Sequence, residues 1–374
     1  MFHYTFTLGR ESALCATEAE AVLEMEKIKI ADKKIAGGFL YFSSEEKIDA
    51  GKIMQRLGGT IKISSEINLD GGDVVESIAN FLNEKITSGK INFSISSQNK
   101  SVGIKIKKLL KEKGRGARYI EPKNTATIIY NNLIKGGADI FERNEKYFIT
   151  LAVQDIESFG LRDYGRPRRD DKSGMLPPKL AMMLINLAKI SEESVLLDPF
   201  CGSGTALSEA AIMGYKNLIG MDNSERAIAD TTINLDWTVN NFDVGKLNLK
   251  IELCDVKNLS KTISAKSIDA IIAEPYLGKQ SHHGETKEDI KKQIIELKEL
   301  YLSAFKEFTR VLKRNSVVIF IIPRFLYGNE WIKIDIKNEI KNIGFETDKL
   351  SDEGPLLYHR ENQFIGREVW RFRY

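Results

Sequence analysis

Hydrophobic and polar positions in the first 64 residues alternate in a way that predicts short strands and helices. The pattern predicts strands at 4–8, 28–30, 38–42 and 60–63 and helices at 11–25 and 45–57. Gly58-Gly59 is a good stop signal for the second helix. The resulting order, β-α-β-β-α-β, is typical of a ferredoxin-like domain.

A second α+β unit follows Gly71-Gly72. Its pattern predicts helices at 74–86, 104–113 and 125–134 and strands at 91–95, 139–141 and 146–153. The middle helix and the segment after it carry basic residues, namely Lys105, Lys107, Lys108, Lys111, Lys113, Arg115 and Arg118. Such a run is typical of a solvated helix face, and it also fits a stripe that binds phosphates.

The segment 156–178 is polar and contains four arginines before Pro177-Pro178, so it is predicted to be a linker. Pro178 can begin a helix. From Ser191 onward, strands and helices alternate at the spacing of a parallel βαβ sheet. The predicted organisation is therefore 1–64, 65–155, a linker at 156–178, and 179–374.

Composition narrows the class of protein. At 374 residues the chain is too long for a single hydrophobic core, so two or three domains are expected. Its composition, 42% hydrophobic and 29% charged residues, fits a globular protein. No apolar stretch approaches the ~20 residues of a membrane span, so no membrane association is expected. Three cysteines, distant and odd in number, indicate a reducing cytoplasm without disulfides or a zinc site. His282-His283 have no third ligand at a supportive spacing, so no metal is expected.

The most informative motif is Asp198-Pro199-Phe200-Cys201-Gly202-Ser203-Gly204-Thr205, between an apolar strand and an amphipathic helix. Glycines there let the backbone approach a ligand, and the helix N-terminus offers unpaired N–H groups. A dinucleotide loop would have a third glycine where Leu207 stands, and a P-loop lysine is absent. The string resembles the S-adenosylmethionine loop of the amino-group methyltransferases. The resemblance implies that Asp198, Pro199, Gly202, Gly204 and Thr205 bind that cofactor.

Two further carboxylates end predicted strands. Asp222 follows an apolar strand roughly twenty residues after the glycine loop, where it can accept hydrogen bonds from both ribose hydroxyls or cap the next helix. Asp255 follows the next strand. In methyltransferases a side chain there contacts the adenine edge, and the alternative is a turn aspartate.

Glu274-Pro275-Tyr276 end a buried strand where amino-methyltransferases carry [DN]-P-P-[YF]. A carboxylate and a backbone carbonyl can accept the N–H groups of an exocyclic amine, and an aromatic ring can stack on the base. Orientation and electrostatics dominate such catalysis. The match is imperfect, because Glu replaces Asp and Tyr276 stands in the place of the second proline. Either Glu274 and Tyr276 do the same work through a local shift, or the activity is weakened or altered.

Together these features resemble the archaeal and eukaryotic tRNA guanosine-10 N2-methyltransferases, which join ferredoxin-like, THUMP and Rossmann-fold methyltransferase domains. Family-like segments are Leu8-Gly9-Arg10, Arg166-Pro167 and Gly174-Met175-Leu176-Pro177-Pro178-Lys179-Leu180-Ala181. The resemblance implies an α/β fold with a seven-stranded sheet and N2-methylation of a tRNA guanosine, with Glu274, Pro275 and Tyr276 in catalysis.

The same resemblance implies partners for the chain. It assigns Lys107, Lys108, Lys111, Arg115 and Arg118 to RNA binding, and some family members work with a small zinc-binding activator subunit. The alternatives are a DNA or rRNA exocyclic-amino methyltransferase and a catalytically weakened RNA-binding homologue.

Overall fold

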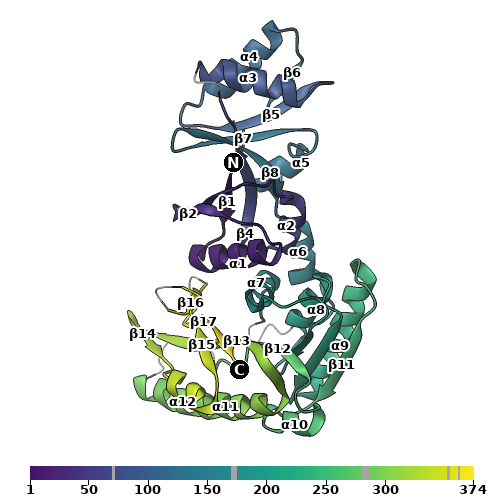
Figure 1. The fold of residues 1–374 in the computed structure, drawn as a ribbon, viewed down its shortest axis with the longest axis vertical. Coiled ribbons are helices and arrows are strands. Elements are labelled where there is room, and N and C mark those ends of the chain that lie inside the picture. The colour runs from purple at the N-terminus through teal and green to yellow at the C-terminus, as the bar shows by residue number, and fades with distance from the viewer. Residues whose placement is uncertain (70–71, 170–174, 280–285, 352–353, 361–362) are drawn as a thin grey trace. The chain divides into compact units, whose positions relative to one another are not determined.

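The computed structural model describes the chain except for residues 70–71, 170–174, 280–285, 352–353 and 361–362. It contains two compact units (Figure 1). The first unit comprises Met1–Ser12, Leu23–Gln55 and Thr60–Ile156. The second comprises Ala13–Val22, Arg56–Gly59 and Glu157–Tyr374. His282 and His283 lie outside the described residues.

One eight-stranded sheet runs through the first unit, in the order β2-β3-β1-β4-β8-β7-β5-β6. Its strands are β1 (Phe2–Leu8), β2 (Ala31–Ala36), β3 (Phe39–Ser44), β4 (Thr60–Glu66), β5 (Ile91–Ser96), β6 (Ala117–Tyr119), β7 (Gly137–Arg143) and β8 (Lys146–Val153). With α1 (Ser12–Met25) and α2 (Ala50–Arg56), the first four strands have the predicted ferredoxin-like order. Because β4 pairs with β8, the predicted boundary at residue 64 falls inside a strand of a continuous sheet. The domain boundaries remain a proposal.

The strand predicted at 28–30 is wrong, because the edge strand β2 begins at Ala31. Its register is set by the turn at Gly37-Gly38, where both glycines have positive φ (56° and 79°). That turn pairs Ala36 with Phe39 and places Lys34 opposite Tyr41. The turn geometry therefore determines where β2 pairs with β3. Ile28 and Ile30, on which the predicted strand rested, lie just before β2.

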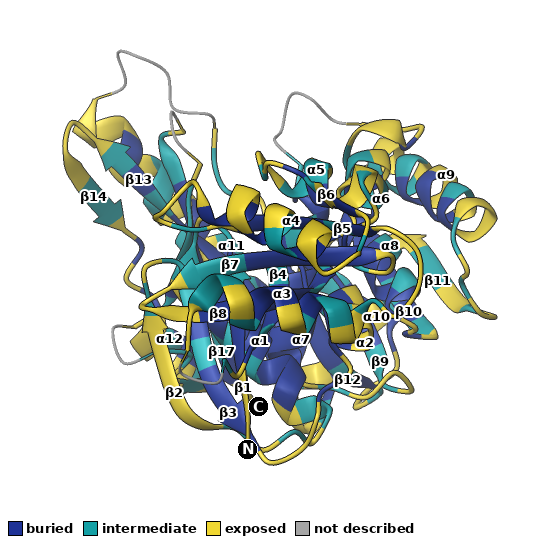
Figure 2. Ribbon diagram, turned by 90° about the horizontal axis from the view of Figure 1, so that it is seen from above, coloured by how far each residue is buried: buried dark blue, intermediate teal, exposed yellow. Residues whose placement is uncertain are grey.

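Helices α3 (Val74–Lys85), α4 (Val102–Glu112) and α5 (Thr125–Tyr130) follow β4. Asp73 caps α3 by accepting the backbone N–H groups of Val75 and Glu76. Helix α4 buries Ile106 and Leu110 against a core that includes Phe93. The opposite side of α4 is exposed (Figure 2) and carries most of its lysines.

The second unit is built on a sheet with the order β11-β10-β9-β12-β13-β17-β15, and β14 pairs with β13 and β16 with β17. The strands are β9 (Val195–Asp198), β10 (Asn217–Asp222), β11 (Asn248–Leu253), β12 (Ile268–Ala273), β13 (Leu312–Tyr327), β14 (Glu330–Lys333), β15 (Glu346–Asp348), β16 (Leu356–Tyr358) and β17 (Ile365–Arg373). The five strands from β11 to β13 are parallel, and β17 is antiparallel to β13. This confirms the predicted seven-stranded Rossmann-like sheet.

From Pro178 onward the helices of this unit are α7 (Pro178–Ala188), α8 (Thr205–Ile212), α9 (Glu225–Asn241), α10 (Leu259–Thr262), α11 (Lys287–Val311) and α12 (Lys337–Ile343). Buried aromatic residues on α11, among them Phe305 and Phe308, pack against Phe320 of β13. Helix α9 is buried along one side through Leu235 and Thr238 (Figure 2). Among the described residues, no helix is both long and apolar enough to cross a membrane.

The predicted linker is more ordered than a polar connector. Ile156–Gly160 forms α6 and Leu161–Gly165 a short π-helix. Arg162 is buried, and its Nε lies 3.4 Å from a carboxylate oxygen of Glu209 on α8. Arg166 is buried as well. Two of the arginines that suggested solvent exposure therefore pack inside the second unit, because a buried acid on α8 compensates their charge.

Candidate active site

The glycine loop turns the chain from β9 into α8. Gly202 and Gly204 both have positive φ, 54° and 79°, which glycine adopts without steric cost. A Cβ at Gly204 would lie 2.9 Å from Cγ2 of Thr231, so this glycine also allows α9 to pack closely against the loop. Gly204 is the N-cap residue of α8, whose first backbone N–H groups follow directly.

Asp198 ends β9 beneath this loop and is almost completely buried. Its Oδ1 accepts the backbone N–H of Phe200 at 3.1 Å. Burial raises the pKa of Asp198 to about 8, and the negative charges of Asp222 and Glu274 add to the effect. A cationic group bound beside this carboxyl would relieve that electrostatic cost.

Asp222 ends β10, the strand next to β9. Its Oδ2 accepts the N–H of Gly202 and its Oδ1 that of Ser224, each at 3.0 Å. The prediction that Asp222 could cap the next helix is wrong, because the side chain of Ser224 caps α9 by accepting the N–H of Ala227. The carboxylate is held in place by two backbone groups and keeps lone pairs that hydroxyl groups can approach.

Asp255 follows β11 and caps a short 3-10 helix by accepting the N–H of Lys257. Asp255 is thus a turn aspartate, which was one of the two interpretations of its sequence position. It also lines the cavity described next. The two interpretations are compatible because a carboxylate accepts several hydrogen bonds.

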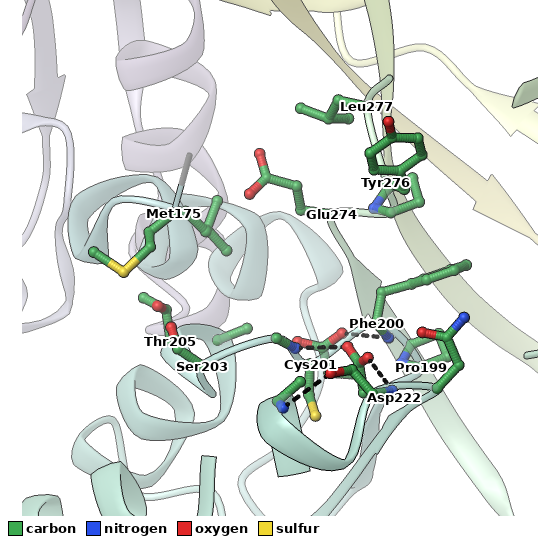
Figure 3. A pocket seen from close by; sticks show the side chains of 18 of the residues that line it. Met175, Pro199, Phe200, Cys201, Ser203, Thr205, Asp222, Glu274, Tyr276 and Leu277 are labelled. Carbon is green, nitrogen blue, oxygen red and sulfur yellow. Dashed lines mark hydrogen bonds between the residues drawn. The ribbon is translucent and has the colours of Figure 1, made fainter. Parts of the chain in front are cut away.

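A cavity of about 730 Å³ lies over the carboxyl ends of these strands. This is where parallel α/β sheets place their ligands. Of the predicted residues, its lining contains Asp198, Pro199, Gly202, Thr205, Asp222, Asp255, Glu274, Pro275 and Tyr276 (Figure 3). Gly204 is not among the described residues that line it. Met175 of the segment before α7 contributes to the lining as well.

Glu274, Pro275 and Tyr276 come directly after β12. The Glu274 side chain points into the cavity (Figure 3), and its exposed fraction is 12%. Tyr276 is 54% exposed and also lines the cavity. Leu277 also lines the cavity. Three consecutive residues, Glu274, Pro275 and Tyr276, therefore contribute to one part of the lining.

Sequence reasoning missed three residues that form hydrogen bonds with residues lining the cavity. Arg367 on β17 donates through Nε to Oε1 of Glu274 at 2.5 Å. Tyr301 on α11 donates its hydroxyl to the backbone carbonyl of Tyr276 at 2.7 Å. Arg166 donates to the hydroxyl of Thr205 at 2.5 Å. Strand β17 carries three arginines, Arg367, Arg371 and Arg373, and nothing in the sequence singled out Arg367 as the partner of Glu274.

The predicted RNA-binding residues lie in the first unit, whereas the residues that line the cavity belong to the second. Lys108 and Lys111 of α4 and Arg118 of β6 are exposed, and Lys107 is half-buried. Arg115 differs, because its guanidinium donates to Oδ1 of Asn83 and to the carbonyl of Ile86. Two of its donors are therefore committed to the C-terminal end of α3.

Comparisons with known proteins find similarity to methyltransferases. Residues 166–326 match the family model described as RMKL-like, methyltransferase domain. The tRNA (guanine(10)-N2)-dimethyltransferase of Methanocaldococcus jannaschii is 29% identical over 299 residues, covering 72% of this chain and 74% of that protein. The probable tRNA (guanine(10)-N2)-dimethyltransferase of Methanothermococcus thermolithotrophicus is 32% identical over 149 residues, covering 39% of this chain and 80% of that protein.

Among solved structures, TrmN from Thermus thermophilus aligns with a TM-score of 0.52 at 15% identity, covering 100% of this chain and 99% of that one. At this identity the likeness shows the fold alone.

The sheet order and the glycine loop, together with the matching family model, define a Rossmann-fold methyltransferase domain that follows an α+β N-terminal region in the chain. This confirms the fold class predicted from the sequence. Within that class, the similarity to the Methanothermococcus protein is decisive, because the chain spans most of that relative. The chain belongs to the tRNA (guanine(10)-N2)-dimethyltransferase family. The predicted family, a tRNA guanine-N2 methyltransferase of the guanosine-10 type, is thereby confirmed.

Proposed function

We propose that this chain uses S-adenosylmethionine to methylate N2 of guanosine 10 in tRNA, twice in succession. Family membership supports the substrate and the reaction. The observation that carries the proposal is the placement of Glu274 in the same cavity as Asp198 and Asp222. Acceptors for an exocyclic amine and acceptors for a nucleoside cofactor are thereby brought together.

The donor set of the cavity fits S-adenosylmethionine. Asp198 is a buried acid, and its raised pKa marks a place where the ammonium group of the cofactor would be stabilised. Asp222 presents acceptors for ribose hydroxyls, and Asp255 for the adenine amine. Pro199, Gly202 and Thr205 would line the path between them, with Gly204 shaping the loop. When bound, the cofactor supplies an electrophilic methyl group whose electron pair stays with sulfur as N2 attacks.

The residues after β12 would orient the guanine. Its N2 is a weak nucleophile because the lone pair is delocalised into the ring. A carboxylate oxygen of Glu274 and the carbonyl of Pro275 would accept the two N–H groups, while the ring of Tyr276 would stack on the base. After transfer N2 carries one proton too many, and the Glu274 carboxylate would receive it and pass it to solvent. The glutamate therefore serves mainly as an acceptor that fixes geometry.

The first unit would bind the tRNA. Lys107, Lys108, Lys111, Arg115 and Arg118 would contact the phosphate backbone, which gives affinity without sequence information. Sequence information would then come from the cavity and from the distance between the bound tRNA and Glu274.

Labelled-methyl transfer to tRNA transcripts with guanosine or adenosine at position 10 tests the proposal. We expect transfer to the first transcript only, and nuclease digestion should yield N2-methylated and N2,N2-dimethylated guanosine. The purified chain is used alone, which also tests whether a zinc-binding activator subunit is required. Equal transfer to both transcripts, or transfer to duplex DNA, would contradict the proposed substrate.

The Glu274→Ala variant tests the site within the same assay. We expect it to lose transfer while cofactor binding stays near normal, because Glu274 acts on the amine. Glu299→Ala, which removes an exposed carboxylate of α11, is the matched control and should retain full turnover. Near-wild-type turnover of Glu274→Ala would eliminate the site assignment.

A further inference from the structure

Glu274 and Arg367 form an ion pair inside the cavity, although they come from strands that are not neighbours. Nε of Arg367 lies 2.5 Å from Oε1 of Glu274, and the two side chains are 8% and 12% exposed. Both residues line the cavity. We propose that Arg367 is a positioning residue that holds one oxygen of Glu274 and so directs the other toward the target amine. This inference rests on the role proposed for Glu274.

The geometry requires two long side chains. Glu274 follows β12, and Arg367 lies opposite Pro323 of β13, so the arginine reaches toward β12 across one intervening strand. Strands are about 4.8 Å apart, which puts β17 roughly 10 Å from β12. An aspartate at position 274 would withdraw the carboxylate by about 1.5 Å and break the contact. The contact with Arg367 therefore accounts for a glutamate at position 274 where an aspartate would be too short.

The ion pair also determines what the carboxylate can do. With Oε1 held by Arg367, Oε2 is the oxygen that would accept an N–H of the guanine. A hydrogen bond between two charged groups is short and directional, so it restricts the rotation of a side chain that would otherwise have three flexible torsions. Fixed acceptors are what a reaction controlled by orientation needs.

Charge supports the same role. The negative charge of Glu274 acts on the buried Asp198 and on Tyr301. The guanidinium of Arg367 balances that charge where little water is present, because removing one partner of a buried pair leaves the other uncompensated. No strong base is needed here, because the amine proton becomes acidic once the new N–C bond has formed.

The test is a double-mutant cycle on the full chain with Arg367→Met, Glu274→Asp and the double variant. The readouts are kcat on tRNA at saturating cofactor and the Kd for S-adenosylmethionine by calorimetry. We expect Arg367→Met to lower kcat by about 10- to 100-fold, as a misplacement of about 1 Å does, with the cofactor Kd unchanged. Arg367→Lys should recover part of the loss. In the Glu274→Asp background, where the contact is already broken, Arg367→Met should change kcat by less than about threefold.

Arg371→Met is the matched control, because Arg371 lies on the same strand and pairs with Asp348 away from the cavity. It should lose comparable thermal stability and keep its kcat. The inference is overturned if Arg367→Met retains wild-type kcat, or if it costs the same factor in the wild-type and Glu274→Asp backgrounds. If Glu274→Ala itself retains turnover, the proposed function of the site fails instead, so the two failures are distinguishable.

Discussion

The hydroxyl of Tyr301 donates a 2.7 Å hydrogen bond to the backbone carbonyl of Tyr276. Tyr301 is completely buried on α11, and burial, with the charge of Glu274 adding, raises its pKa well above the ordinary value. The hydroxyl therefore remains a donor at any working pH. It ties the segment that would hold the guanine to the longest helix of the second unit, so the position of Tyr276 depends on the packing of α11.

Tyr301→Phe should lower kcat severalfold and leave the cofactor Kd unchanged. The substitution leaves the Tyr276 carbonyl without its donor, which costs about 1–3 kcal/mol if no water replaces it. Tyr215→Phe is the matched control, since Tyr215 is equally buried and donates to the carbonyl of Ile190 away from the cavity. Kinetics and thermal melts of both variants check this. Equal loss of turnover in both would mean that the hydrogen bond to Tyr276 has no special role.

The placement of the three aspartates in one cavity could be predicted from sequence because it obeys a simple rule. Asp198 and Asp222 end β9 and β10, and Asp255 lies just after β11. The carboxyl ends of parallel strands meet at one edge of the sheet. The structure brings all three to one cavity. Hydrophobic patterning and short motifs were enough to place them.

The other side of the site could not be predicted in this way. Arg367 reaches Glu274 because β17 enters the sheet antiparallel to β13, and a pairing between residues so far apart in the chain has no local signal. The same holds for Arg166, which the polar sequence placed in a linker and the fold places against Thr205. Long-range ion pairs depend on tertiary packing, whereas strand ends depend mainly on local pattern.

Asp222→Ala should weaken S-adenosylmethionine binding by about one to two powers of ten, equivalent to the loss of roughly 1.5–3 kcal/mol from hydrogen bonds to a charged group. Two backbone N–H groups fix this carboxylate, so the wild-type acceptors are preorganised. Asp269→Asn is the control, because Asp269 accepts the N–H of Val195 at the opposite end of the strands. Calorimetric titration measures both. An unchanged Kd for Asp222→Ala would exclude the ribose role.

Charge reversal of two lysines tests the basic face of α4. Lys107→Glu with Lys111→Glu should lower tRNA affinity and flatten its salt dependence, because each lost phosphate contact removes roughly 0.7–0.9 from the slope of log K against log salt. Lys337→Glu with Lys341→Glu is the control, since these lysines have the same spacing on the exposed side of α12. Binding is measured between low and moderate salt. If both double variants lose affinity equally, the effect is one of net charge.

Asp198→Asn should make the stability of the ligand-free protein less dependent on pH. The folded-state pKa of Asp198 is raised to about 8 from the ordinary value of 3.8. The folded state therefore holds a proton that the unfolded state has already released, and stability falls as the pH rises between these values. The fall is at most about 1.4 kcal/mol per pH unit from this group, and it ends once the folded carboxyl is ionised near pH 8. Urea unfolding of wild type and variant at pH 5, 6.5 and 8 should show an advantage of Asp198→Asn that grows with pH. A difference that stays constant across this range would mean that Asp198 is ionised in the folded protein throughout, and that burial does not raise its pKa.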